Sequence, residues 1–418
     1  MSLAAHIVHT LCEVWAGLNV GFTATLLVGL LFLRRRFVRA RAALQPAEAD
    51  RETWPAIAIL RPCEGREPGL HENLLSSLTA PYPGPREVLF LVPSQDDPAH
   101  AIAHDVQMQA RALQVGSDAR VLVTSPPALC NRKAFQLAAA LSATQAPIVV
   151  SADSDVRLAR DDLPALLAPL CGSLPTNAQT VGASFAAPIE VAPQTAWDRA
   201  GAALVCASAQ SFLALYGLYA LRPATPAGKA HTAPMMAGAL CAMPRAALEQ
   251  IGGFSAFFDC LGEDNEIARR LCALGYRIAV SPRAARCFDG GRSAREVIER
   301  AARWQTVVRA QRPALWPTYP LMLGVTPALV LLALLWPSTV LGGFVALLFV
   351  LRALLAHALL RLQGLPAGPL RSTVAFLQGE GLLWLGFVRS AISRRITWRG
   401  HPFHIERGGR LRPATDVG

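Results

Sequence analysis

The stretch PIVVSADSDV, residues 147–156, is an apolar run followed at once by an acidic triplet. Its apolar part, Ile148–Ser151, is short and rich in β-branched residues, which predicts a buried strand. Asp153, Ser154 and Asp155 follow directly. A parallel sheet would place the two carboxylates in the crevice beyond the carboxyl end of that strand. Such a triplet alone is often a solvated turn, but the buried strand before it favours a ligand site.

Similar apolar runs occur on both sides of this stretch, and helix-like segments separate several of them. Strands that are continuously apolar and alternate with helices are typical of an α/β domain with a mainly parallel sheet, so we predict this fold class. The other predicted strands are Ala56–Leu60, Val88–Val92, Val121–Thr124, Val181–Phe185 and Ile278–Ser281. The predicted helices are Leu70–Leu78, Ala99–Val115 and Arg132–Leu141.

The two ends of the chain are apolar. The 418 residues are 52% hydrophobic and only 17% charged, and the excess of apolar residues is terminal. Val14 to Leu33 carries no charge and is long enough for one transmembrane helix. A cluster of arginines follows it, which by the positive-inside rule places the next part of the chain in the cytosol. The arginines are Arg34, Arg35, Arg36, Arg39 and Arg41.

Three later segments are also apolar. Tyr319–Leu335 and Ser338–Leu360 predict a helical hairpin through the membrane, whereas Val374–Val388 has basic residues on both flanks and is expected to dip in or lie flat. Gly201–Leu221 is long enough to span, but spanning would separate the acidic motifs across the bilayer. We therefore expect a buried or interfacial helix there, followed by a mobile loop at Pro223–Pro234.

Charge and cysteine usage limit the partners and the compartment. The net charge of +11 indicates an anionic partner, and the arginines gather beside apolar runs, so we expect the phospholipid bilayer and not nucleic acid. The nine cysteines are scattered without a metal or disulfide pattern, which indicates a reducing compartment. The Ala, Arg and Pro content suggests a bacterium, so the expected location is the bacterial inner membrane.

Further acidic and basic motifs carry chemistry. Asp96–Asp97 follows the second strand, and Glu263–Asp264 opens a helix. Carboxylates at helix starts often only favour the helix dipole, but one in a pocket can act as a general base. Arg300 and Arg303 share a helix face and could clamp a diphosphate, with Trp304 as a stacking surface; a basic helix on anionic lipid is the alternative. Oxygen ligands at Asp153 and Asp155 would select Mg²⁺ or Mn²⁺.

In this order, the four motifs resemble those of inverting glycosyltransferases with the GT-A fold, and among them most closely the ceramide glucosyltransferases. The stretches that carry the resemblance are LRPCEGREPGLHENLLSSL at 60–78, DDPA at 96–99, CNRK at 130–133, GGFSAFFDCLGEDNEIA at 252–268, RAARW at 300–304 and ITWRG at 396–400. Two departures from the family pattern are Asn265, where an aromatic residue is usual, and Cys63-Glu64, where Leu-Lys is common.

The resemblance implies a role for each site residue. Asp97 and Asp153 would contact the nucleotide of a UDP-sugar, and Lys133 would also bind the donor. Asp155, with Asp153, would hold the metal, and Asp264 would deprotonate the hydroxyl of a membrane lipid. A second set of residues would close over the diphosphate and the acceptor: Arg300, Arg303 and Trp304. The expected reaction transfers glucose to ceramide with inversion.

Other functions stay open at this point. The acceptor could be a hopanoid or diacylglycerol, the protein could be a processive polysaccharide synthase, or it could bind nucleotide sugars without catalysis. The expected domains are a transmembrane anchor at 1–36, a cytosolic GT-A domain at 50–292, an interfacial helix at 293–316, a membrane hairpin with an interfacial or re-entrant helix at 317–392, and a basic cytosolic tail at 393–418.

Overall fold

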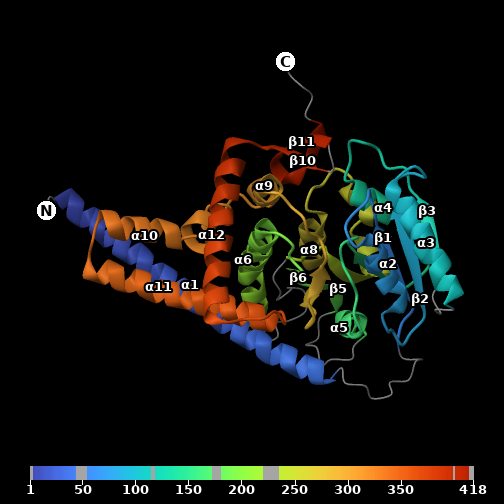
Figure 1. Cartoon of the computed structure of the whole chain (residues 1–418), viewed down its shortest axis with the longest axis horizontal. Coiled ribbons are helices and arrows are strands. Elements are labelled where there is room, and N and C mark those ends of the chain that lie inside the picture. The colour runs from blue at the N-terminus through green and yellow to red at the C-terminus, as the bar shows by residue number, and fades with distance from the viewer. Residues whose placement is uncertain are drawn as a thin grey trace. The chain divides into compact units, whose positions relative to one another are not determined.

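The structure is a computed structural model of the whole chain. It describes residues 3–43, 54–113, 118–171, 180–219, 235–398 and 401–413, so the loop predicted at Pro223–Pro234 lies outside the described residues. The chain divides into an α/β unit and a helical unit (Figure 1). The α/β unit comprises Arg36–Pro193, Arg222–Gly290 and Thr397–Gly418. The helical unit comprises Met1–Arg35, Gln194–Leu221 and Gly291–Ile396.

A seven-stranded sheet with the order β3-β2-β1-β4-β7-β5-β8 forms the α/β unit. Neighbouring strands are parallel except where β7 pairs antiparallel with β4 and β5. The predicted fold class is therefore confirmed, and every predicted strand is present; β7 was not predicted. The strands are β1 (Ile57–Pro62), β2 (Arg86–Val92), β3 (Asp118–Val123), β4 (Ile148–Ala152), β5 (Val181–Ala186), β7 (Leu240–Pro244) and β8 (Arg277–Val280).

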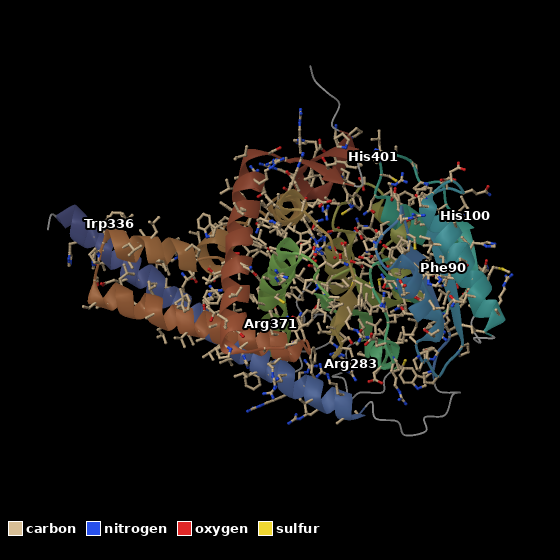
Figure 2. The ribbon with its side chains drawn as sticks, in the orientation of Figure 1. Phe90, His100, Arg283, Trp336, Arg371 and His401 are labelled. Atoms are coloured by element: carbon tan, nitrogen blue, oxygen red, sulfur yellow. The ribbon has the colours of Figure 1, made fainter. Side chains whose placement is uncertain are left out.

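The core of this unit follows from the alternation of side chains along the strands. Every second residue of β1, β2 and β4 packs with apolar residues of α2 (Leu70–Thr79), α3 (Pro98–Ala112) and α5 (Asp162–Leu167). Phe90 of β2 is fully buried in this layer (Figure 2). Because β1, β2 and β4 are parallel neighbours, the loops at their carboxyl ends meet at one edge of the sheet.

Smaller elements complete the α/β unit. Helix α4 (Arg132–Ser142) packs on β1 and β2. The C-terminal segment forms a three-stranded sheet, in which Leu411 N donates to Asp259 O at 2.7 Å. This contact ties the tail to the loop before α8. The remaining elements are β6 (Pro188–Glu190), α7 (Arg245–Gln250), the 3-10 helix Phe254–Phe257, α8 (Glu263–Ala273), β9 (Ala285–Cys287), β10 (Arg395–Trp398), β11 (His401–Ile405), the 3-10 turn Arg407–Gly409 and β12 (Leu411–Pro413).

Among the described residues, three helices are long and apolar enough to cross a membrane: α1, α6 and α11. Helix α6 covers most of the segment at 201–221, and 67% of its most apolar 18 residues are buried, while a buried instead of a spanning helix stays a prediction. It packs against α9, α11 and α12 of the helical unit. The helices are α1 (Leu3–Ala43), α6 (Ala196–Tyr219), α9 (Ala294–Gln311), α10 (Thr326–Leu335), α11 (Thr339–Leu362) and α12 (Pro369–Ile392).

The first arm of the predicted hairpin is interrupted. A π-helical turn at Tyr319–Leu323 precedes the ten-residue helix α10. The helix is interrupted between Leu323 and Thr326, and this interruption is called the break below. Glu380 lies inside the continuous helix α12 and is buried. Its carboxylate accepts from Thr326 N at 2.9 Å and so satisfies the start of α10. A carboxylate is tolerated in this apolar helix because it accepts a hydrogen bond from a backbone N–H group that the break leaves without a helical partner.

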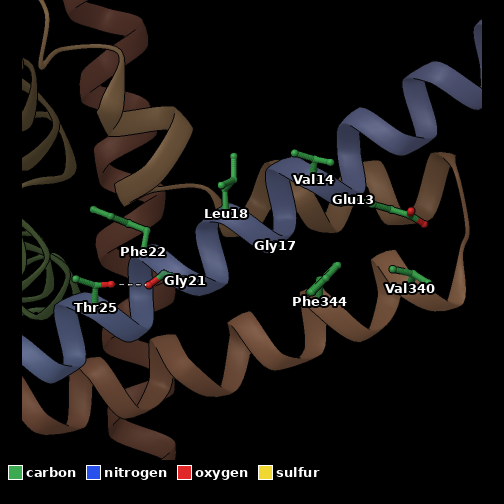
Figure 3. A pocket seen from close by; sticks show the side chains of 9 residues that line it. All are labelled: Glu13, Val14, Gly17, Leu18, Gly21, Phe22, Thr25, Val340 and Phe344. Carbon is green, nitrogen blue, oxygen red and sulfur yellow. Dashed lines mark hydrogen bonds between the residues drawn. The ribbon is translucent and has the colours of Figure 1, made fainter.

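An open groove of about 690 Å³ lies between α1 and α11 (Figure 3). Gly17 and Gly21 have no side chains to fill it, and the remaining lining is mostly apolar. At one end, the Glu13 carboxylate accepts from Ser338 Oγ at 2.7 Å. The groove is therefore an apolar surface on two helices that are able to cross a membrane.

Candidate active site

The acidic triplet lies in the loop that follows β4, as predicted. Asp153 N donates to Ala239 O at 2.8 Å, and Val156 N donates back to Asp153 O at 3.0 Å, which closes a tight turn. The Asp155 carbonyl accepts from Phe288 N at 2.7 Å. The backbone of the turn is thus held on several sides, so the two carboxylates are carried by a fixed frame.

Arg61 holds this turn from beneath. It lies near the end of β1, is fully buried, and donates from Nη2 to Val156 O at 2.8 Å and to Ser154 O at 3.4 Å. Asn73 Nδ2 donates to the same Ser154 carbonyl at 3.1 Å. Burial lowers the pKa of Arg61, and the nearby negative charges, among them Asp155 and Asp153, oppose this shift and keep the cation stable. Arg61 was quoted in the opening motif but not predicted to act.

Lys133 bridges two acidic motifs. Its Nζ lies 2.6 Å from Asp153 Oδ1 and 3.6 Å from Glu263 Oε1, and it donates to Gly238 O at 3.1 Å. Burial alone would lower the pKa of Lys133, but the two carboxylates outweigh it and raise the pKa above its ordinary value. The lysine therefore stays charged and joins the triplet after β4 to the start of α8.

Asp264 is the carboxyl group with the properties of a base. Its Oδ2 accepts from Gly238 N at 2.9 Å, and its Oδ1 accepts from Asn265 N at 2.8 Å. Burial, followed by the charge of Glu263, raises the pKa of Asp264 to about 6. A Cβ at position 238 would lie 3.1 Å from Asp264 Cβ, so glycine permits this close approach. A carboxylate that titrates near neutral pH is suited to accept a proton.

The neighbouring Glu263 has a different environment. Its Oε2 accepts from Asn131 Nδ2 at 2.9 Å, and Oε1 faces Lys133. Asn131 also caps α4 by accepting from Ala134 N at 2.9 Å and donates to Cys260 O at 2.7 Å. Glu263 is thus part of a hydrogen-bonded framework that joins α4 to α8, while Asp264 is positioned separately on Gly238.

Asp97 lies at the same edge of the sheet, after β2. Its Oδ1 accepts from Ala99 N and from Gly65 N, each at 2.8 Å, so it caps α3 and holds the loop after β1. In that loop, Glu64 pairs with Arg132 at 2.8 Å. The unusual acidic residue in the opening motif, Glu64, therefore has a basic partner in the CNRK stretch.

The side chains of the acidic triplet suit a hard divalent cation as their ligand-bound metal. Asp153 and Asp155 offer carboxylate oxygens, which Mg²⁺ and Mn²⁺ prefer. The structure also brings the thiol of Cys241 near these acids, but burial raises its pKa to about 12, so it stays protonated and is a poor ligand. Within the described part of the chain, no group of three or more His, Cys, Asp or Glu could hold a metal. The metal assignment therefore rests on two carboxylates and remains a prediction.

The basic motif belongs to the helical unit. Arg300, Arg303 and Trp304 lie on α9, whose N-terminus is capped reciprocally by Ser293 and Glu296. The guanidinium of Arg300 stacks over the ring of Trp304 at 4.8 Å. The structure thus brings Lys133, Asp153 and Asp264 together in the α/β unit, whereas the approach of the α9 residues to a bound donor remains a prediction.

The chain is similar to known proteins over most of its length. The chain is 23% identical to ceramide glucosyltransferase 1 of Caenorhabditis elegans over 371 residues, covering 86% of this chain and 74% of the relative. It is 22% identical to ceramide glucosyltransferase 3 of the same organism over 386 residues, with the same coverage. A solved structure, the Pyrobaculum calidifontis mannosyltransferase PcManGT with GDP-Man and Mn²⁺, is similar with a TM-score of 0.48 and 17% identity, covering 91% of this chain and 99% of that one.

The profile of one protein family covers almost the whole chain. It spans residues 21–411, which include every acidic and basic motif described above. The similarity to glycosyltransferases predicted from those motifs is confirmed. The chain belongs to glycosyl transferase family 21 and is a glycosyltransferase of the ceramide glucosyltransferase type.

Proposed function

We propose that this glycosyltransferase moves a sugar, expected to be glucose, from a UDP-sugar to the hydroxyl of a membrane lipid, expected to be ceramide. The observation that carries the proposal is the half-buried Asp264, which accepts from Gly238 N and whose pKa is raised to about 6 beside a cluster that contains Asp153 and Lys133. Such a base can remove a proton from an alcohol at neutral pH. Similarity to ceramide glucosyltransferases supports the choice of donor and acceptor.

The proposed step is a single displacement. The lipid oxygen attacks the anomeric carbon, its proton passes to a carboxylate oxygen of Asp264, and the bond from that carbon to the UDP oxygen breaks. A new glycosidic bond forms with inversion, and UDP leaves with the electron pair. Holding the two substrates in line accounts for much of such catalysis.

Other residues of the chain bind and orient the donor. Asp97 and Asp153 are proposed to contact the nucleotide, and Asp155 with Asp153 would hold Mg²⁺ or Mn²⁺. When bound, that cation neutralises charge on the departing diphosphate. Arg300 and Arg303 are proposed to add positive charge to the same group.

We further propose that the catalytic site faces the cytosol of a bacterial inner membrane. Helix α1 is long and apolar enough to cross a membrane, and its last turns carry the basic cluster that begins at Arg34. Positively charged ends of this kind stay on the cytosolic side. A UDP-sugar from the cytosol and a lipid from the bilayer would then meet at one site.

The test uses the full-length protein in detergent or vesicles with Mn²⁺. Radiolabelled UDP-glucose, UDP-galactose and UDP-N-acetylglucosamine are each incubated with ceramide, diacylglycerol and hopanoid lipids, and products are identified by mass spectrometry. A single sugar on ceramide is expected. A labelled polymer would favour the polysaccharide synthase, labelled hopanoid or diacylglycerol would change the acceptor, and no transfer from any donor would contradict the proposal.

A further inference from the structure

Helix α12 is the element against which the helix with the basic motif is packed. Within the helical unit, α12 has its most extensive contacts with α9 and α6 (Figure 1). Two of its glycines allow these neighbours to come close. A Cβ at Gly379 would lie 2.9 Å from Ala203 O of α6, and a Cβ at Gly386 would lie 2.9 Å from Ala301 C of α9. Only a residue without a side chain fits at such distances.

Ala301 lies inside the basic motif itself. A helix turns by roughly 100° per residue, so Arg300 and Trp304 lie on the same flank, and Arg303 lies on the side opposite Ala301. Because Ala301 is the residue that meets Gly386, the contact sets how far Arg303 projects from α12. Any increase in the separation of the two helices moves the whole motif outward.

Other contacts hold α9 and the chain after it against α12. Glu299 pairs with Arg389 at 3.4 Å. Trp316 stacks on Phe387 with ring centroids 4.3 Å apart, and its Nε1 donates to Ser390 Oγ at 3.2 Å. The Gly386 contact is therefore flanked by an ion pair, a ring stack and a hydrogen bond. These contacts oppose any shift or tilt of α9 that would relieve a clash at Gly386.

Helix α12 is itself fixed to the break before α10. Glu380 accepts from Thr326 N at 2.9 Å and from Thr326 Oγ1 at 3.1 Å, and lies 3.5 Å from Nε of the buried Arg352. Arg352 Nη1 donates to Leu323 O at 3.2 Å, and Trp384 Nε1 donates to Gly324 O at 2.5 Å. The backbone groups of the break thus anchor α12, because polar groups left unpaired in an apolar environment are strongly unfavourable.

We infer that Gly386 is a positioning residue for the transfer reaction, since its contact with Ala301 sets the place of Arg300, Arg303 and Trp304. The inference rests on the proposed function, in which these three residues bind the donor diphosphate. Gly386 touches no substrate and acts through α9. Adding one methyl group would displace the motif by a few tenths of an ångström to about 1 Å, and a misplacement near 1 Å can lower a rate about 100-fold.

The experiment compares four full-length variants for transfer from the UDP-sugar that the wild type uses: G386A, R303A, the double variant G386A/R303A, and G381A. Gly381 is the matched control, because it lies in the same helix and a Cβ there meets nothing within 4 Å. We expect G386A to lower kcat about 10- to 100-fold and G381A to change it less than about twofold. In the R303A background, G386A should lower kcat by a smaller factor than it does alone, because one of the three residues that it displaces is already absent. Rates are normalised to the fraction of protein that binds UDP with Mn²⁺.

The outcomes separate the inference from the proposed function. If G386A is as active as G381A, or lowers kcat in R303A by the same factor as it does alone, Gly386 does not act through the motif and the inference is wrong. If R303A itself is fully active, the proposed donor clamp fails instead. Should G386A not fold, A301S adds one atom from the other side of the same contact, and the same non-additivity with R303A is required.

Discussion

Lys133 Nζ lies 2.6 Å from Asp153 Oδ1, which joins the N-terminal turn of α4 to the acidic loop after β4. The same ammonium group lies 3.6 Å from Glu263 Oε1. One cation thus offsets the charges of two motifs that are 110 residues apart in sequence, from 153 to 263. Lys133 is therefore a built-in counter-charge of the acidic cluster.

Replacing Lys133 by methionine should weaken the site in two ways. Asp153 and Glu263 lose their shared cation, so we expect UDP affinity to fall at least about tenfold. The charge of Lys133 also lowers the pKa of Asp264, so its loss should move the acidic limb of the pH–kcat/KM profile to higher pH. K133R is the control and should keep the limb in place. An unchanged profile in K133M would show that Lys133 does not influence the base.

The pH dependence of the reaction should follow Asp264. A base must be deprotonated, and the pKa of Asp264 is raised to about 6, so kcat/KM should rise with pH through about 6 and then level. The charge of Glu263 contributes to this raised value, so E263Q should shift the limb to lower pH. E266Q, on the same helix but paired with Arg269 and Arg270, should not shift it. If the acidic limb of the kcat/KM profile stays at the same pH in E263Q, a group other than Asp264 is responsible for the titration.

Arg61 should determine the Mn²⁺ concentration that the enzyme needs for activity. It donates to two carbonyls of the turn that carries Asp153 and Asp155, and lysine cannot reproduce both bonds. We expect R61K to raise the Mn²⁺ concentration for half-maximal activity about tenfold, while R66K, at an exposed position in the loop after β1, leaves it unchanged. Titration of Mn²⁺ against initial rate measures this. Equal curves for the two variants would mean that the turn holds its shape without Arg61.

The charge pair of Glu64 and Arg132 should be replaceable as a unit. E64K alone places two cations where the 2.8 Å pair now lies and should lower the free energy of unfolding by about 1 kcal/mol. Adding R132P should restore most of it, because residue 132 is the first residue of α4, where proline is tolerated. Denaturant unfolding of the single and double variants measures the difference. A double variant that is less stable than E64K would contradict this explanation.

Much of the α/β unit could be predicted because its strands are continuous apolar runs. The acidic motifs were recognisable for the same reason, since each follows such a run or opens a helix. β7 was not predicted, because Leu240–Pro244 is short and its antiparallel partner Ile148–Ala152 is distant in sequence. Without β7, neither the Asp153–Ala239 bond nor the proximity of Cys241 could be foreseen.

Buried charges were the least predictable feature. The predicted strand ended at Leu60, and an arginine after a strand usually lies at the surface. In the structure β1 includes Arg61, and the pairing of β1 with β4 shows that this side chain is enclosed. Likewise, the apolar run at 319–335 contains no signal for its break apart from glycine and proline. The side chains that stabilise the break, Arg352 and Glu380, lie on other helices. Tertiary contacts, rather than local preference, decide both features.

The most direct test of the central claim is the transfer rate of D264N, measured with saturating donor and lipid beside its affinity for UDP. The asparagine keeps the shape of Asp264 but cannot take a proton, so transfer should fall about 10²- to 10⁴-fold while UDP still binds within about threefold of the wild type. Near-normal transfer by D264N would contradict the assignment of Asp264 as the base and, with it, the mechanism proposed for this glycosyltransferase.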